Sequence, residues 1–250
     1  MHIVTDAVVL RAYEGGRNSR LLILLTREHG RIAAVARGAG SLKSALCAAS
    51  GQFCYASFVL FRNADKYVVD SADIKELFYE LREDVTRLAA AQYMAEVCGE
   101  LAREEEPDEA LLRILLNSLY ALCKLNLSPA LCKAVFELKA AAAEGYQPDL
   151  SACAVCGGEP AGGVSVDALE GIMRCAGCAP AGGTGIRLSG EALGTLREVF
   201  SLPVERMFSF SASGAVMGEI AFFAERYLLM QTELRPKTLS FFNTLLQGDL

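Results

Sequence analysis

The sequence predicts an α+β protein in which a small β-barrel precedes an α-helical domain that carries an embedded four-cysteine finger. Three observations support this. Short β-rich runs fill residues 3–74, apolar residues recur at helical spacing after residue 75, and two CxxC pairs lie within residues 153–178. We expect the boundaries 1–78 for the barrel domain, 79–250 for the helical domain and about 150–181 for the finger.

Five β-rich runs predict the barrel: IVTDAVVLRAY, SRLLILLT, GRIAAVA, GQFCYASFVLF and KYVVDSADI. EGGRNS and REHG between them hold the Gly and Asn that tight turns need for positive φ. GAGSLKSALCAAS separates the third run from the fourth, where a five-stranded OB-fold has its flexible connection or short helix. The order and spacing therefore predict an OB-fold.

Helical periodicity follows in REDVTRLAAAQYMAEVCGELARE, DEALLRILLNSLYALCKL and ALCKAVFELKAAAAEG. Asp108 and Ser128 are expected to be N-caps, and Gly145 a C-cap. Residues 189–247 are expected to return to helix, most clearly in GAVMGEIAFFAERYLLM. We expect a helical bundle.

The two CxxC pairs are separated by eighteen residues, a spacing found in tetrahedral zinc sites. Four thiolates leave no open coordination position, so we expect one structural Zn²⁺ per chain, with no role in activating a nucleophile. The expected ligands are Cys153, Cys156, Cys175 and Cys178. A redox dithiol or four unliganded cysteines are the alternatives. The segment between the pairs is glycine-rich with one short β-like run.

The other five cysteines show no metal-ligand spacing, and we expect them to pack as small buried residues. They are Cys47, Cys54, Cys98, Cys123 and Cys132. In 250 residues, 52% hydrophobic and 22% charged, we find neither a secretory signal nor an apolar run suited to a membrane span. We therefore expect a cytoplasmic protein, associated with the nucleoid if it binds DNA.

Charge is segregated along the chain despite a net charge of −6. Residues 11–43 carry seven basic and two acidic side chains, whereas residues 81–110 carry three basic and nine acidic ones. A basic stretch on a barrel is suited to a phosphate backbone, although a solvated face is the alternative. The candidate DNA-binding residues are Arg11, Arg17, Arg20, Arg27, Arg31, Arg37 and Lys43.

Aromatic side chains on the same strands offer stacking surfaces for bases, but we expect them to pack the barrel core. They are Phe53, Tyr55, Phe58, Phe61 and Tyr67. Catalysis has little support, because the chain has only two histidines, no P-loop and no GxGxxG. His29 is expected to lie in a solvated turn. We therefore predict a binding protein without catalytic residues.

Several stretches resemble the bacterial recombination mediator family RecO. They are DAVVLRAYEGGRNSRLLILLTREHGRIAAVARGAGSLKS, VFELKAAAAEGYQPDLSACAVCG, RCAGC and LRPKTLSFFNTL. The resemblance implies an OB-fold and a helical domain with a zinc finger, binding single- and double-stranded DNA. It further implies strand annealing, displacement of single-strand-binding protein, and action with RecR in loading RecA.

Two departures from the family pattern concern DNA binding. GAGSLKS carries only one charge, Lys43, where relatives are often more basic, and Asn18 lies near a position that is often acidic. Weaker DNA affinity or dependence on a partner is the expected consequence of the first departure, and none is drawn from the second.

Two other classes of function stay open at this point. One is a zinc-stapled interaction scaffold that touches no nucleic acid, and the other is an enzyme that uses zinc or cysteine.

The resemblance also implies that the helical region docks the acidic, hydrophobic C-terminal tail of single-strand-binding protein. Such a tail needs an apolar groove and cations near its carboxylate. The candidate cations are Arg113, Lys124, Lys133 and Lys139. The alternative for each is the wet face of an amphipathic helix.

Overall fold

We obtained a computed structural model that describes residues 1–16, 18–64 and 66–248. It divides into two compact units, residues 1–125 with 236–250 and residues 126–235. The chain leaves the first unit after Leu125 and returns to it at Pro236. Among the helices of these described residues, none has both the length and the apolar character needed to span a bilayer.

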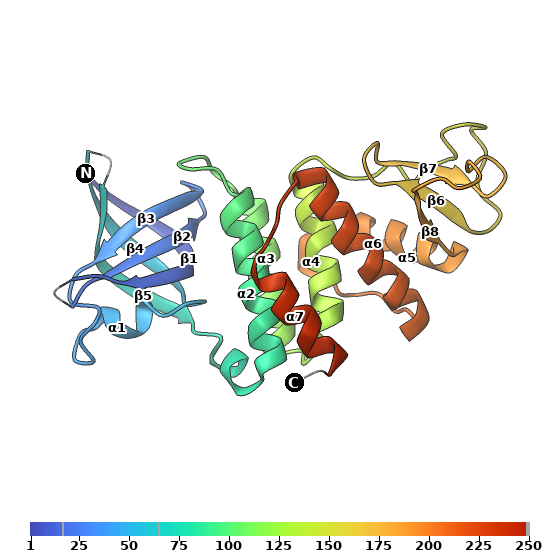
Figure 1. Ribbon diagram of the computed structural model, residues 1–250. Coiled ribbons are helices and arrows are strands. Elements are labelled where there is room, and N and C mark those ends of the chain that lie inside the picture. Colours follow the sequence, from blue (N-terminus) through green and yellow to red (C-terminus); the bar gives the residue numbers. More distant parts are fainter. Residues whose placement is uncertain (17, 65, 249–250) are drawn as a thin grey trace. The chain divides into compact units, whose positions relative to one another are not determined.

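The first unit begins with a closed five-stranded barrel, shown in blue to cyan in Figure 1. Its strands are β1 (His2–Glu14), β2 (Arg20–Thr26), β3 (Arg31–Ala36), β4 (Tyr55–Asn63) and β5 (Lys66–Glu76). The order around the barrel is β1-β2-β3-β5-β4, with β3 and β5 parallel. This is the strand order of an OB-fold, so that prediction is confirmed. The connection from β3 to β4 holds the short helix α1 (Leu46–Ala49).

The barrel interior is packed mostly by aliphatic side chains, with the aromatic rings of Phe58 and Tyr67 among them. Phe53, Phe58 and Tyr67 are buried, which confirms that these three belong to the core. Tyr55 is half-buried, and Phe61 is 39% exposed. The difference follows from the pleat, because successive residues of a strand point to opposite faces of the sheet. The barrel therefore keeps few aromatic rings free for stacking on bases.

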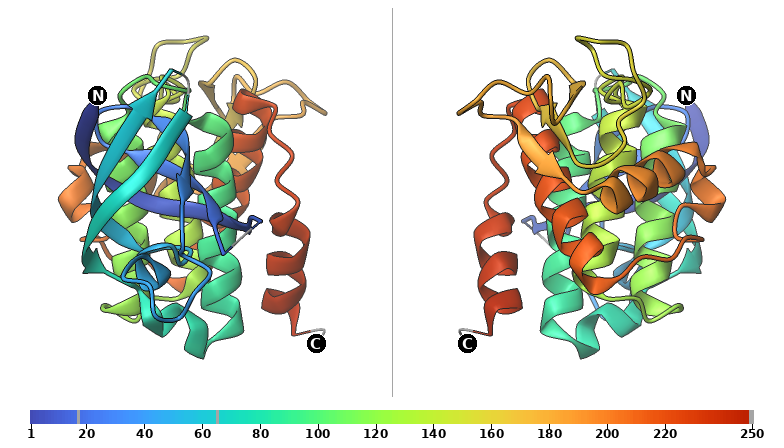
Figure 2. Two further views of the ribbon diagram at one scale, coloured as in Figure 1. Left: turned by 90° about the vertical axis from the view of Figure 1, so that its left-hand side faces the viewer. Right: turned by 90° about the vertical axis from the view of Figure 1, so that its right-hand side faces the viewer.

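Helices complete the first unit: the 3-10 helix η1 (Tyr79–Glu83) and helices α2 (Val85–Leu101), α3 (Glu109–Cys123) and α7 (Thr238–Gln247). The Asp108 carboxylate accepts a hydrogen bond from the Leu111 amide at 3.0 Å, which confirms the predicted N-cap of α3. Helix α7 packs on α2, and both views of Figure 2 show the two running side by side. The C-terminal segment thus belongs to the same unit as the barrel.

Glu96 of α2 connects three parts of this unit. Its side chain is only 4% exposed. Its Oε1 lies 3.2 Å from Nη2 of Arg11 on β1, and its Oε2 accepts hydrogen bonds from the amide and hydroxyl of Thr238 at 2.9 and 2.7 Å. Burial alone would raise the pKa of Glu96, but the hydrogen bonds from Thr238 and the charge of Arg11 outweigh it and lower that pKa. The Glu96 carboxylate therefore fixes β1 and the start of α7 to α2.

Glu96→Gln is expected to lower the free energy of unfolding by about 2 kcal/mol at pH 7, because charged hydrogen bonds are lost from a buried position. A depressed carboxyl pKa stabilises the fold above its unfolded value of about 4.3, and that contribution disappears as the pH falls through the folded value. The difference from wild type should therefore shrink in acid. Urea titrations between pH 7 and pH 3 measure it. The exposed neighbour Glu100→Gln is the control, and a Glu96→Gln protein as stable as this control would contradict the assignment.

The second unit combines a helical layer with the cysteine finger. Its elements are helices α4 (Pro129–Ala143), α5 (Gly190–Ser201), η2 (Val204–Arg206) and α6 (Gly214–Thr232), and strands β6 (Val164–Asp167), β7 (Ile172–Cys175) and β8 (Ile186–Leu188). Ser128 caps α4 through a 3.2 Å hydrogen bond to the Leu131 amide, and Gly145 follows the helix with φ of 88°. The predicted N-cap is confirmed, whereas the C-cap is Glu144 and Gly145 is the left-handed residue directly after it.

The three strands form an antiparallel sheet in the order β7-β6-β8. The sequence predicted a single β-like run between the cysteine pairs, and this was incomplete. The strands have only three or four residues each, too few for alternation to identify them. The predicted domain boundary between residues 78 and 79 stays a prediction. Strand β5 ends at Glu76, but the compact unit that contains it continues through α3.

Candidate metal centre and nucleic-acid interface

The four cysteines of the CxxC pairs converge in the second unit. Their Sγ atoms all lie within 4.8 Å of one another, and those of Cys156 and Cys175 are 4.0 Å apart. Four thiolates around one zinc ion at about 2.3 Å have sulfur separations of about 3.8 Å. The cluster therefore has the donor set and nearly the size of a tetrahedral thiolate site. Cys153 is buried, whereas Cys156 is exposed.

Two tight turns bring each pair together. After the first pair, the Gly157 amide donates to the Cys153 carbonyl at 2.8 Å, and Gly157 has φ of 70°, which favours glycine. In the second pair, the amides of Cys178 and Ala179 donate to the Cys175 carbonyl at 3.0 and 2.9 Å. The Cys175 amide also donates to Cys153 Sγ at 3.3 Å, which links the two turns. Local backbone geometry thus shapes the cluster.

The pKa values of the thiols in the cluster differ. Hydrogen bonds from the backbone around Cys156 and from the Cys175 amide lower the pKa of Cys153 to about 6. Hydrogen bonds with Cys175 and the other cluster sulfurs raise the pKa of Cys178 to about 12. Amide donation to sulfur stabilises a thiolate, which is the form that binds metal. A bound divalent cation would favour the thiolate form at the remaining positions.

Cysteines outside the cluster have the environment of packing residues. Cys54, Cys98 and Cys132 are buried, as predicted, whereas Cys47 and Cys123 are half-buried. Burial raises the pKa of Cys54 to about 11, and that of Cys123 to about 11 as well. Neither environment produces the lowered pKa of a reactive thiol.

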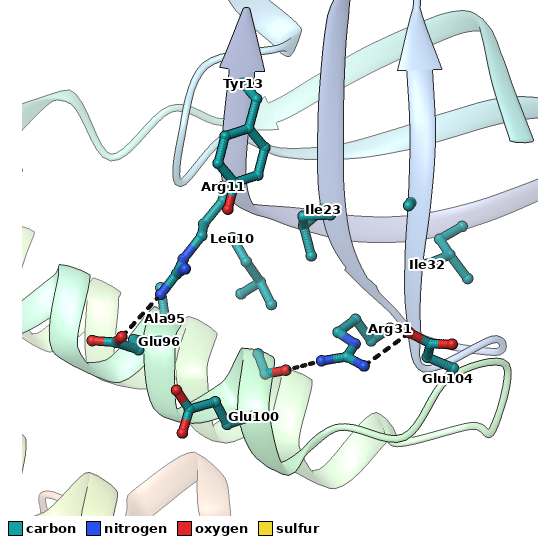
Figure 3. A pocket seen from close by; sticks show the side chains of 12 residues that line it. Leu10, Arg11, Tyr13, Ile23, Arg31, Ile32, Ala95, Glu96, Glu100 and Glu104 are labelled. Carbon is teal, nitrogen blue, oxygen red and sulfur yellow. Dashed lines mark hydrogen bonds and ion pairs between the residues drawn. The ribbon is translucent and has the colours of Figure 1, made fainter. Parts of the chain in front are cut away.

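The basic residues of the barrel fall into two groups. The first group, Arg11, Arg27 and Arg31, is paired with carboxylates that follow the barrel in sequence. The nitrogen-oxygen distances are 3.2 Å to Glu96, 2.7 Å to Glu109 and 2.9 Å to Glu104. Figure 3 shows the pairs of Arg11 and Arg31. A phosphate would have to compete with these carboxylates, so this group is poorly suited to bind a nucleic acid.

The second group is Arg20, Arg37 and Lys43, which we call the turn-end surface. Arg20 pairs in register with Ala36, the residue before Arg37. The loop that carries Lys43 is held to the β1–β2 turn by a 2.9 Å hydrogen bond from the Gly40 amide to the Asn18 carbonyl. Arg20 Nη1 donates to the Cys47 carbonyl at 3.3 Å. The three cations therefore lie at the same end of the barrel.

Among the described residues no carboxylate forms an ion pair with the turn-end surface, although Glu14 is the register partner of Arg20 on β1. Arg37 and Lys43 are exposed, and Leu42 between them is 94% exposed. A cation without an acidic partner is available to phosphate, and an exposed apolar side chain can contact a base or sugar. Arg17, also a candidate, lies outside the described residues. The sequence analysis did not single out Leu42 as a possible contact residue. Its position next to Lys43 in a predicted loop could have indicated that it is exposed.

The four candidate cations for a partner tail have different surroundings. Arg113 is exposed. Lys124 pairs with Glu76 at 3.7 Å and with Glu80. Lys133 and Lys139 are 5% and 6% exposed, so the wet-face alternative is wrong for both. Arg113 and Lys124 belong to the first compact unit, and Lys133 and Lys139 to the second.

The two buried lysines already have partners within their own unit. Lys133 Nζ lies 2.7 Å from Glu137 and 2.8 Å from Glu225 of α6. Lys139 Nζ donates to the Leu202 carbonyl at 2.6 Å, and burial lowers its pKa. The sequence pattern indicated a solvated helix face for these lysines. In the structure, α4 is buried on all sides from Cys132 to Ala141. Binding of a tail by these four residues stays a prediction, and charge reversal at Lys133 would disturb folding before it tested binding.

His29 lies in the turn between β2 and β3, as predicted. Its amide donates to the Thr26 hydroxyl at 2.9 Å, and the Thr26 amide donates to the Gly30 carbonyl at 2.8 Å. These contacts hold the turn, and they are made by backbone groups and the Thr26 hydroxyl, not by the His29 imidazole.

Comparison with known proteins covers nearly the whole chain. The family models described as Recombination protein O N terminal and Recombination protein O C terminal match residues 1–78 and 82–240. A DNA repair protein RecO of Acetivibrio thermocellus is 31% identical over 98% of this chain and 97% of its own length. One of Symbiobacterium thermophilum is 33% identical over 96% of each chain, and one of Anaeromyxobacter sp. (strain K) is 40% identical over 69% of each.

Proposed function

Since the chain belongs to the RecO family of DNA repair proteins, we propose that it is a DNA-binding recombination mediator. It binds single- and double-stranded DNA through its barrel, anneals complementary single strands and, with RecR, helps to replace single-strand-binding protein by RecA. The observation that carries the proposal is the turn-end surface, three cations at one end of an OB-fold without acidic partners among the described residues. It acts in the cytoplasm, at the nucleoid.

The surface would contact DNA mainly through phosphates. Arg37 and Lys43 are exposed and would displace counterions from the backbone of either strand, which makes binding insensitive to sequence and sensitive to salt. The aromatic side chains are mostly in the core, so stacking would contribute less than it does in many OB-folds. Weak, nonspecific attachment suits a protein that must let two complementary strands find each other.

We propose that the cysteine cluster binds one Zn²⁺ through Cys153, Cys156, Cys175 and Cys178. Thiolates favour soft and borderline metals, and four of them saturate a tetrahedral ion. The bound ion would supply cross-linking of the two turns and no chemistry on a substrate. We infer that strand annealing on this protein is driven by binding alone, without an enzymatic step.

A second candidate function is a protein-interaction scaffold that does not bind nucleic acid. Its support is the excess of acidic residues in segment 81–110, three of which already neutralise arginines of the barrel. Salt-dependent binding to an oligonucleotide distinguishes the two functions, because a scaffold would show no affinity at low salt.

Annealing of two complementary labelled oligonucleotides, without ATP, tests the proposed function. We expect the protein to accelerate annealing of bare strands and of strands covered by single-strand-binding protein. If only bare strands anneal faster, annealing of strands covered by single-strand-binding protein requires a partner such as RecR. Absence of acceleration at low salt in both cases would contradict the proposal and favour the scaffold.

A further inference from the structure

A cavity of about 330 Å³ lies within the first unit, between the outer wall of the barrel and helix α2 (Figure 3). Its floor is apolar and consists of side chains from both sides, Leu10, Ile23 and Ile32 from the strands and Ala95 from the helix. A volume of this size lies within the range of pockets that hold a bound group. Charged residues surround the apolar floor.

Two ion pairs on this rim are internally satisfied. On one side, Arg11 pairs with Glu96, whose other oxygen accepts two hydrogen bonds from Thr238. On the other side, Arg31 donates to the Gly99 carbonyl and pairs with Glu104 at 2.9 Å. Each pair is neutral in itself, so neither needs an external ligand to balance its charge.

Glu100 is the charge left over. It lines the same cavity, is exposed, and Figure 3 shows its side chain between the two ion pairs. Among the described residues, no group pairs with or donates to its carboxylate. The cavity therefore presents one unneutralised negative charge next to an apolar floor.

The exposed ring of Tyr13 lines this cavity as well. An aromatic face attracts a cation, as a carboxylate does. Phosphate is disfavoured here, because its charge would be repelled by Glu100 while both arginines are already neutralised. The lining thus suits a group with an apolar part and a positive charge.

We propose that this cavity is a docking site for a protein segment in which an apolar side chain is followed by lysine or arginine. The apolar side chain enters between Leu10 and Ile32, and the cation pairs with Glu100 at the mouth. The site is separate from the turn-end surface, so it lets the protein hold a partner while the barrel stays available to DNA. This function does not depend on DNA binding.

Gly99 provides a way to close the site without damaging the fold. It lies within α2, and a Cβ built there would lie 3.7 Å from Leu10 Cδ1, an ordinary van der Waals contact. A larger side chain at this position would extend into the cavity, and glycine is a poor helix former that most residues improve on. Gly99→Leu is therefore expected to fill the cavity and keep the helix.

The probes are the capped peptides Gly-Leu-Lys-Gly and Gly-Leu-Glu-Gly at millimolar concentration, with methyl NMR signals of Ile23 and Ile32 as the readout. We expect the lysine peptide to shift both signals, and the glutamate peptide to bind at least fivefold more weakly. Glu100→Lys should reverse that preference, and Gly99→Leu should abolish binding of both peptides. Glu83→Lys, an exposed charge reversal before α2, is the control and should change nothing.

Three outcomes would overturn the proposal. These are equal affinity of wild type for the two peptides, no methyl shift with either, or an effect of Glu83→Lys equal to that of Glu100→Lys. A short oligonucleotide added alone should leave the two methyl signals in place. If it shifts them in wild type but not in Gly99→Leu, the cavity binds nucleic acid and the protein-docking assignment is wrong. Thermal melts confirm that each variant is folded.

Discussion

Cys153→Ser is expected to release the metal and to lower the melting temperature of the second unit more than any other single change in the finger. Cys153 is buried, and its Sγ accepts the Cys175 amide that joins the two turns. Structural zinc contributes about 10–16 kcal/mol in small zinc-finger peptides, comparable with the stability of a whole domain. The finger's three strands of three or four residues have little core of their own to replace that contribution.

Elemental analysis and calorimetry of the purified protein measure this effect. We expect one zinc per wild-type chain, much less in Cys153→Ser, and a parallel loss of stability when wild type is treated with a chelator. Cys47→Ser is the matched control, since Cys47 is half-buried and outside the cluster. A variant with serine at all four ligand positions that melted like wild type would refute a structural metal.

Replacement of Arg37 and Lys43 together by glutamine is expected to weaken binding to a single-stranded oligonucleotide by about tenfold at moderate salt. Each phosphate contact to a single strand contributes a slope of about −0.7 in a plot of log K against log salt, so loss of two contacts should make the slope shallower by about 1.4. The loss should be nearly the same for different sequences, because phosphates carry no base information. Both residues are exposed, so folding should be unaffected.

The paired arginines supply the matched control, with the same number of charges removed from the same barrel. Arg27→Gln with Arg31→Gln removes two cations that already pair with Glu109 and Glu104. We expect this variant to lose little affinity for DNA. Fluorescence anisotropy across a salt series compares the two variants. Equal losses would show that the whole basic stretch acts as one patch, and no loss in either would show that the turn-end surface is only solvated.

The sequence by itself determined the elements whose signals are local. The five strands of the barrel were evident from β-rich runs separated by short turns and loops, most of which contain glycine. The N-caps at Asp108 and Ser128 and the glycine after α4 were predicted from residue type, because capping depends on one side chain and the adjacent backbone. The four cysteines were singled out for the same reason, since each pair lies within a single turn, and the structure brings all four together.

What the charged residues do was decided only by the tertiary structure. The sequence showed a basic stretch and an acidic stretch, but not that Glu96, Glu104 and Glu109 would pair with arginines of the barrel. Nor did it show that Lys133 would be buried against Glu137 and a second helix. The physical reason is range. Capping and turn formation act over three or four residues, whereas a charge is neutralised by whichever opposite charge the fold brings within about 4 Å, here up to 92 positions away in sequence.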